Sequence, residues 1–186
     1  MTEQVAVIDI GSNSIRMSIM QVGENHCYRM ICQMKEALRL SAQINETGEL
    51  PAAAVDRMIQ VLRAFARQIR LHKVTQVQAV ATAALRRAEN RDWVLQRITQ
   101  ETGLQVEVIS GETEAYYDYL GVIYTVPLED FVLLDTGGGS SEIVLVQQRK
   151  LTARVSIPYG AVVLQERFGD KTEDMIRFLK KAMGEI

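Results

Sequence analysis

The stretch FVLLDTGGGSSEIVLVQ, residues 131–147, decides the fold. It consists of an apolar run, Asp135, a turn of small residues and a second run in which apolar residues alternate. This order predicts a strand, a tight turn and a returning strand, with the aspartate at the tip. Because glycine has no Cβ atom, several backbone N–H groups of such a turn can approach one phosphate oxygen. The residues of this turn that we expect to bind phosphate are Gly137, Gly138, Gly139 and Ser140.

A partial repeat of this pattern, VAVIDIGSNSIRMSIMQV, occupies residues 5–22. Asp9 takes the place of Asp135 at the end of the first apolar run, and Ser12 and Ser14 add hydroxyl donors to the turn. Carboxylates at these two positions suit a divalent cation that bridges phosphates. One such hairpin is a weak signal, because many turns contain glycine and serine. Two of them indicate a duplicated unit whose loops face each other across a cleft.

The composition is typical of a soluble globular protein. Of the 186 residues, 47% are apolar and 24% are charged, and the formal net charge is −2. This balance provides no extended basic field for nucleic acid, so a polyanionic ligand must be bound by a local site. We therefore expect no nucleic-acid partner.

The sequence also predicts a cytoplasmic location. Cys27 and Cys32 have no metal-ligand partners nearby, and we interpret them as free thiols in a reducing cytoplasm. The first residues, MTEQVAVIDIG, are too few and too polar for a signal peptide. No run of about 18 apolar residues predicts a membrane span, so we expect no membrane partner.

Hydrophobic periodicity predicts an α/β chain. In the first part of the chain, the predicted strands cover residues 5–10, 15–22, 27–34, 74–81 and 104–109. The predicted helices of that part are one of about 20 residues that opens at Pro51, and two more at 91–102 and 110–121. In the second part, strands at 131–135, 142–147 and 151–157 repeat the three opening strands, and helices follow at 162–168 and 171–183.

Four motifs resemble, in order, those of the exopolyphosphatase and guanosine pentaphosphate phosphohydrolase family. The segments DIGSNSIR at 9–16 and DTGGGSSE at 135–142 are similar to its two phosphate loops. The segment ATAALRRAEN at 81–90 is similar to its Ala-Thr-x-x-x-Arg-x-Ala-x-Asn motif, and ISGETEA at 109–115 to its Gly-x-x-Glu-Ala motif. The resemblance implies an actin-like ATPase (ribonuclease H-like) α/β fold with two lobes. On that basis, residues 1–125 form a complete N-terminal lobe and residues 126–186 begin a second, incomplete one.

The resemblance also implies roles for individual residues. It places the general base at Glu114, with Glu112 as the less favoured candidate, and a phosphate-binding guanidinium at Arg16. Further phosphate-binding residues that it implies are Gly11, Ser12, Asn13, Ser14, Thr82 and Arg86. The implied cofactor is Mg²⁺, with Mn²⁺ as an alternative. The metal ligands that it implies are Asp9, Asp135 and Glu142.

Each of these positions also has a purely structural explanation. Arg16 could be a solvent-facing strand residue, and Thr82 could cap a helical turn that carries a solvated Arg86. Acidic residues at 112 and 114 could lie in the first turn of a helix because the helix dipole favours negative charge there. From the residues alone, these alternatives stay open.

The reaction that the resemblance implies is hydrolysis of a terminal phosphoanhydride, with inorganic polyphosphate or guanosine pentaphosphate as the bound partner. Glu114 would activate water, and Mg²⁺ would spread the charge of the phosphoryl group. Two other functions stay open. One is ATP-dependent phosphorylation of a small molecule by a kinase of the same fold, although such kinases usually have Gly-Thr in the first loop. The other is a non-catalytic regulator that binds polyphosphate or guanosine tetraphosphate.

The second lobe that the sequence predicts is short. Residues 126–186 supply only its first three strands and its first helices, and strands without sheet partners present a pairing edge. We therefore expect a fragment that is a homodimer, is domain-swapped or is poorly active.

Overall fold

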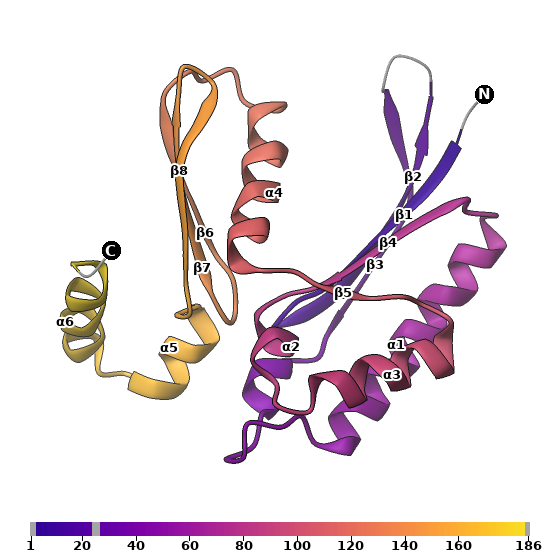
Figure 1. The fold of residues 1–186 in the computed structure, drawn as a ribbon, viewed down its shortest axis with the longest axis horizontal. Coiled ribbons are helices and arrows are strands. Elements are labelled where there is room, and N and C mark those ends of the chain that lie inside the picture. Colours follow the sequence, from indigo (N-terminus) through magenta and orange to yellow (C-terminus); the bar gives the residue numbers. More distant parts are fainter. Residues whose placement is uncertain (1–2, 24–26, 185–186) are drawn as a thin grey trace.

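The computed structural model describes residues 3–23 and 27–184, which form two α/β lobes that meet at one end (Figure 1). The strands are β1 (Glu3–Ile10), β2 (Ser14–Val22), β3 (Tyr28–Ala37), β4 (Gln76–Ala81), β5 (Glu107–Val108), β6 (Phe131–Thr136), β7 (Ser141–Gln147) and β8 (Lys150–Ile157). The helices are the 3-10 turn η2 (Leu40–Gln43), α1 (Ala52–Leu71), α2 (Ala83–Arg87), α3 (Arg91–Thr102), α4 (Gly111–Ile123), α5 (Ala161–Phe168) and α6 (Thr172–Met183). Within the described ranges, every helix is too short or too polar to cross a membrane.

The first lobe is a five-stranded mixed sheet in the order β3-β2-β1-β4-β5. β2 is antiparallel to both β1 and β3, whereas β1, β4 and β5 run parallel to one another. Helices α1 and α3 cover one face of this sheet (Figure 1). Their apolar stripes form the main core of the molecule, in which Phe65 of α1 and Ile98 of α3 are fully buried with Ile8 of β1. This core fixes the edge of the sheet from which the turn between β1 and β2 extends.

The second lobe is the antiparallel sheet β6-β7-β8. Helix α4 packs on one face of this sheet, where Ala115 and Ile123 form a small core with Val144 and Val146 of β7. The packing of α4 shows that the connection between the two sheets begins before residue 125. The lobe boundary at 125 itself stays a prediction.

The predicted elements differ from the observed ones mainly at their ends. The helix after Pro51 has the predicted length, and Pro51 lies immediately before its first residue. β5 contains two residues instead of the six predicted, because only Glu107 and Val108 pair with β4. β3 extends to Ala37, beyond the predicted end, because it pairs with β2 along its whole length.

The two lobes touch at their Gly/Ser turns. Figure 1 shows the two sheets diverging from each other with distance from this contact. The turn between β6 and β7 lies against the first lobe so closely that a Cβ on Gly139 would be 2.4 Å from Ser12 Oγ and 2.8 Å from Ala83 Cβ. Cβ atoms essentially never approach other heavy atoms to less than 3.0 Å. Position 139 therefore requires glycine because of the space between the lobes.

We expect Gly160→Ala to lower the free energy of unfolding by about 1–3 kcal/mol through overpacking. A Cβ on Gly160 would lie 2.5 Å from the Gly137 carbonyl oxygen and 2.6 Å from the Gly139 nitrogen, and backbone cannot move aside as a side chain can. The matched control is Gly121→Ala in α4, which has open space around it and should be neutral or stabilising by about 0.5–1 kcal/mol. Chemical denaturation of both variants measures the difference. If Gly160→Ala and the unaltered protein were equally stable, Gly160 would not pack against the β6–β7 turn as described.

Candidate active site

The β1–β2 hairpin presents a charged pair to the cleft between the lobes. Asp9 lies between Ile8 and Ile10, both fully buried on the core side, so strand alternation turns Asp9 to the opposite face of the sheet. Arg16 is the direct cross-strand partner of Asp9. Burial raises the pKa of Asp9 above its ordinary value, Arg16 partly offsets this rise, and the Asp135 carboxylate adds to it. The aspartates of the two hairpins are therefore close enough to interact.

The β6–β7 hairpin repeats this arrangement with one change. Asp135 is the cross-strand partner of Glu142, so Glu142 takes the register position that Arg16 takes in the first hairpin. Glu142 is 2% exposed, and its carboxylate accepts hydrogen bonds from Ser156 Oγ, at 2.7 Å, and from Ser140. Burial raises the pKa of Glu142, while these two hydrogen bonds lower it. Glu142 is therefore a buried, hydrogen-bonded carboxylate behind the turn.

A pocket of about 360 Å³, which we call the hairpin pocket, lies between the two hairpins. The predicted site residues that line it are Asp9, Asn13, Ser14, Arg16, Thr82, Glu114, Asp135, Gly137 and Gly138. Its other lining residues are Thr136, Ala161 and Val162. Side chains from both hairpins, from the residue before α2 and from the first turn of α4 thus converge on one cavity.

The remaining predicted site residues lie beside the hairpin pocket. Those that line a neighbouring pocket are Arg86, Gly139 and Ser140. Those that line neither pocket are Gly11, Ser12 and Glu142. Gly11 closes the first turn by donating its backbone N–H to the Ser14 carbonyl at 3.1 Å. Ser12 Oγ is buried because the β6–β7 turn of the second lobe covers it. It has no hydrogen-bond partner among the described residues.

Glu114 lies in the first turn of α4, a helix that Ser110 caps with its side chain. The Glu114 carboxylate accepts a hydrogen bond from Arg86 Nη1 at 3.2 Å, and the same Nη1 donates to the Ile109 carbonyl at 2.8 Å. Burial and repulsion from Glu142 raise the pKa of Glu114 to about 7, although Arg86 lowers it. A carboxylate with a pKa near neutral pH can take up and release a proton there, as general acid–base catalysis requires.

Asp118 is a functional candidate that the sequence did not predict. It lies four residues after Glu114 on α4, so both carboxylates lie on one face of the helix. Burial and repulsion from Asp135, Glu142 and Asp9 raise the pKa of Asp118 to about 7. Its Oδ2 atom is buried and has no hydrogen-bond partner within residues 3–23 and 27–184. In the sequence, the four-residue spacing between Glu114 and Asp118 was the one local signal that could have identified Asp118.

The predicted metal ligands fit a cation in part. Asp9 and Asp135 line the hairpin pocket from opposite lobes, and proteins usually hold Mg²⁺ with one or two carboxylates together with water and substrate phosphates. Glu142 instead accepts hydrogen bonds from serine hydroxyls. In the described part of the chain, no three His, Cys, Asp or Glu side chains are grouped closely enough to hold a metal ion by themselves. The donor set therefore favours a cation shared with a bound phosphate.

Comparisons with known proteins identify similar sequences and structures. The family model described as the Ppx/GppA phosphatase family matches residues 4–184. The sequence of the Aquifex aeolicus member of the Ppx/GppA family is 37% identical to this chain, and its crystal structure superposes with a TM-score of 0.82. The match covers 100% of this chain and 63% of that one. An exopolyphosphatase from Cytophaga hutchinsonii is 27% identical, with a TM-score of 0.85, over 98% of this chain and 64% of that one.

A more distant structure is similar in fold alone. The ethanolamine utilization protein EutJ from Carboxydothermus hydrogenoformans is 18% identical, with a TM-score of 0.50, over 93% of this chain and 57% of that one. Together these matches confirm the predicted actin-like α/β fold. The chain spans 63% of the Aquifex aeolicus protein and 64% of the Cytophaga hutchinsonii protein, slightly less than two thirds of each.

We expect Asp118→Asn to raise the melting temperature above about pH 7 and to change it little near pH 4, in the absence of divalent cations. The pKa of Asp118 rises from 3.8 to about 7 on folding, so between these values the folded state holds a proton that the unfolded state has released. The free energy of unfolding therefore falls as pH rises through this window, and the uncharged amide removes that loss. Thermal unfolding across the window, with the exposed Asp170→Asn as control, measures the effect. A stability difference that is independent of pH would count against this account.

Proposed function

The chain belongs to the Ppx/GppA phosphatase family, and we propose that the protein hydrolyses the terminal phosphoanhydride of inorganic polyphosphate or guanosine pentaphosphate. The observation that carries this proposal is the hairpin pocket, in which both phosphate loops and Glu114 come together. The similarity to a protein described as an exopolyphosphatase supports polyphosphate as the substrate class. The product of each turnover is orthophosphate.

The terminal phosphoryl group binds between the two turns in this proposal. Asn13 and Ser14 of the first turn and Gly138 of the second line the pocket, so donors from both lobes can reach the phosphate oxygens. Arg16 adds a guanidinium, whose planar array of N–H donors matches the geometry of a phosphate group. Because the two turns belong to different lobes, a phosphate bound there also holds the lobes together.

Glu114 acts as the general base. Its carboxylate accepts a proton from water while the water oxygen bonds to phosphorus and the bond from phosphorus to the bridging oxygen breaks. The hydrogen bond from Arg86 holds the carboxylate in position for this transfer. Neither cysteine nor histidine is among the lining residues, which fits attack by water better than attack by a thiol or an imidazole.

Asp9 and Asp135 would hold a divalent cation, Mg²⁺ or Mn²⁺, jointly with the substrate phosphates. When bound, this cation supplies positive charge that offsets the negative charge of the phosphoryl oxygens. Because the two aspartates lie on different lobes, a cation bound by both would attract both lobes to the same ligand.

Orthophosphate release from polyphosphate, guanosine pentaphosphate and ATP, measured side by side, tests the proposed function. Faster release from either of the first two than from ATP supports it. Tight binding of polyphosphate without release would favour a non-catalytic regulator. ATP-dependent phosphorylation of a panel of sugars would favour a kinase of the same fold.

We expect Glu114→Gln to lower the turnover number at least about a hundredfold, because the amide cannot accept the proton from water. The matched control is Glu107→Gln, which makes the same change at an exposed position of β5 that lines neither pocket. Initial rates of orthophosphate release measure both variants. Glu114 is not the base if its glutamine variant turns over at the normal rate.

The pH profile provides a second test of the same residue. The active form carries an ionised Glu114, so kcat/KM should rise with pH and level off above about pH 7. Arg86 lowers the pKa of Glu114, so Arg86→Gln should move the rising limb to higher pH, whatever it does to the maximal rate. A rising limb that Arg86→Gln leaves in place would show that another group controls the profile.

A further inference from the structure

Helix α4, which carries Glu114, has little apolar anchoring. Of its 13 residues, Ala115 and Ile123 are buried, whereas α1 buries seven of its 20 residues. The two buried side chains pack on β7 in the small core of the second lobe. Because a helix moves as a rigid element, the position of α4 along the sheet decides where Glu114 lies in the cleft. Polar contacts therefore have a large share in fixing that position.

Arg149, in the turn between β7 and β8, makes several of these polar contacts. Its guanidinium donates to the carbonyl oxygen of Ile123, the last residue of α4. It also donates to the carbonyl oxygens of Val126 and Leu128 in the segment that follows the helix, both at 3.2 Å. The planar array of five N–H donors allows one side chain to bind three acceptors, and the helix dipole favours a positive charge at this end of α4.

The backbone of Arg149 adds two further contacts. Its N–H donates to the Glu129 carbonyl at 2.8 Å, and its own carbonyl accepts a hydrogen bond from the Tyr119 hydroxyl at 3.0 Å. Arg149 has a φ of 61°, and Gln148 before it has a φ of 50°. Such angles are unfavourable for residues other than glycine and persist where surrounding contacts hold them. The contacts of Arg149 thus attach the turn firmly to α4 and to the segment after it.

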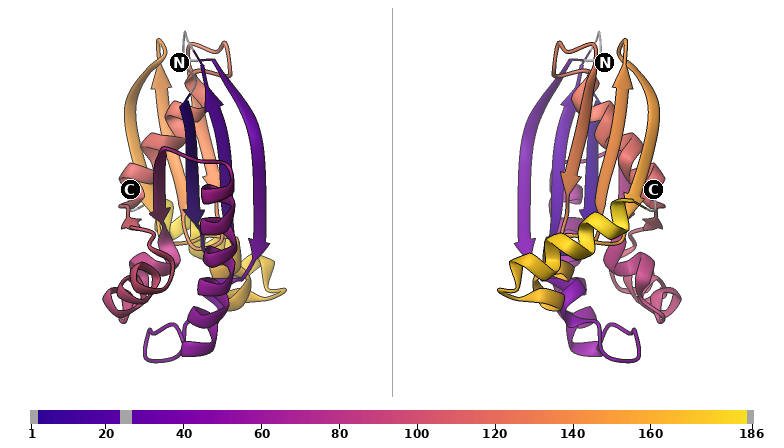
Figure 2. Two further views of the ribbon diagram at one scale, coloured as in Figure 1. Left: turned by 90° about the vertical axis from the view of Figure 1, so that its right-hand side faces the viewer. Right: turned by 90° about the vertical axis from the view of Figure 1, so that its left-hand side faces the viewer.

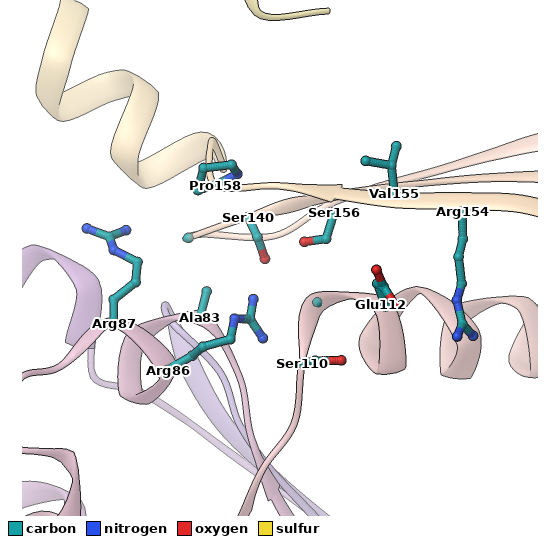
Figure 3. Close-up of a pocket in the computed structure, with 12 residues that line it drawn as sticks. Ala83, Arg86, Arg87, Ser110, Glu112, Ser140, Arg154, Val155, Ser156 and Pro158 are labelled. Carbon is teal, nitrogen blue, oxygen red and sulfur yellow. The ribbon is translucent and has the colours of Figure 1, made fainter. Parts of the chain in front are cut away.

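The β7–β8 hairpin also contacts the opposite end of α4. In Figure 2 the β7–β8 turn, orange at the top, lies at the end of the second sheet that is farthest from the contact between the lobes. At the near end, Figure 3 shows Ser156 of β8 beside the start of α4, which Ser110 and Glu112 mark. Ser156 packs so closely against Gly111 that a Cβ on the glycine would overlap it. One hairpin therefore holds both ends of the helix.

The Arg149 contacts can affect Glu114 through the length of α4. Ile123 lies nine positions after Glu114, which is about 14 Å along the axis at 1.5 Å per residue. A shift of α4 along the sheet would move Glu114 relative to Arg86, its hydrogen-bond partner on the first lobe. A displacement of about 1 Å at a reacting group, caused by a distant substitution, can lower a rate about a hundredfold.

We propose that Arg149 is a positioning residue for the general base: it fixes α4 along the second sheet and thereby holds Glu114 at the hairpin pocket. This inference rests on the proposed function, since it concerns the residue that activates water there. Arg149 lines neither the hairpin pocket nor the pocket beside it. Its effect on turnover should therefore come through α4 and not through contact with the substrate.

Orthophosphate release measured in two backgrounds tests this role. We expect Arg149→Gln to lower kcat at least about tenfold and to change KM less than about twofold, because glutamine cannot donate to three carbonyls at once. In the Glu114→Gln background, the same substitution should change kcat less than about twofold, because the residue that Arg149 positions has already lost its function. The matched control is Lys150→Gln, which removes the same charge from the exposed next residue and should leave kcat unchanged. Circular dichroism checks that each variant is folded.

Titration of the Glu114 carboxyl group, followed by carbon-13 NMR, provides a readout that does not need activity. Burial is the largest cause of the raised pKa of Glu114, ahead of repulsion from Glu142. A displaced α4 admits water to Glu114, so Arg149→Gln should lower its pKa from about 7 toward the ordinary value of 4.5. The neighbouring groups Glu142, Asp118 and Arg86 are the same in the Lys150→Gln control, which should titrate like the unaltered protein.

The proposal is overturned if folded Arg149→Gln turns over at the normal rate, or if Glu114 titrates in it as in the unaltered protein. An equal loss of kcat in both backgrounds would also overturn it, because Arg149 would then act on the fold and not through Glu114. If the unaltered protein releases no orthophosphate from any substrate, the proposed function fails, while the titration still decides whether Arg149 positions α4.

Discussion

The close contact between the two Gly/Ser turns is the constraint on which the site depends. Gly139 fits between Ser12 and Ala83 only because it has no side chain. This contact fixes the two sheets relative to each other at one end, so that Asp9 and Asp135 face a single cavity. It also brings α4 of the second lobe to α2 of the first, where Arg86 reaches Glu114. If the hairpins were apart, Asp9 and Asp135 would not line one cavity together with Glu114.

The carboxylates around the hairpin pocket oppose the stability of the folded protein at neutral pH. Burial and mutual repulsion keep the pKa above its ordinary value at Asp9, Glu114, Asp118 and Glu142. A folded protein gains nothing from such repulsion, whereas a site that handles protons or a cationic ligand requires it. These carboxylates therefore lower the stability of the folded protein when no ligand is bound. A cationic ligand would relieve their repulsion.

Local signals explain how much of this could be predicted from the sequence. Alternating apolar residues and glycine turns determine a hairpin within about ten residues, so Asp9 and Asp135 could be placed near the two turns, although both lie inside their strands and not at the tips. Resemblance to a family added Glu114 and Arg86. Asp118 could not be singled out, because its environment depends on how α4 packs beside Asp135 and Glu142 of the second sheet. The surroundings of Glu142 were equally inaccessible, since its hydrogen-bond donor Ser156 comes from another strand.

The two hairpins share one register but differ in the residue opposite the aspartate, which is Arg16 in the first and Glu142 in the second. A duplicated site with identical halves would accept a linear anion in either orientation. The partner of Asp9 is therefore basic, whereas the partner of Asp135 is a buried acidic side chain, so the two halves of the duplicated unit differ in charge. A ligand bound between the hairpins would therefore meet a guanidinium from the first lobe, and none from the second among the described residues that line the pocket.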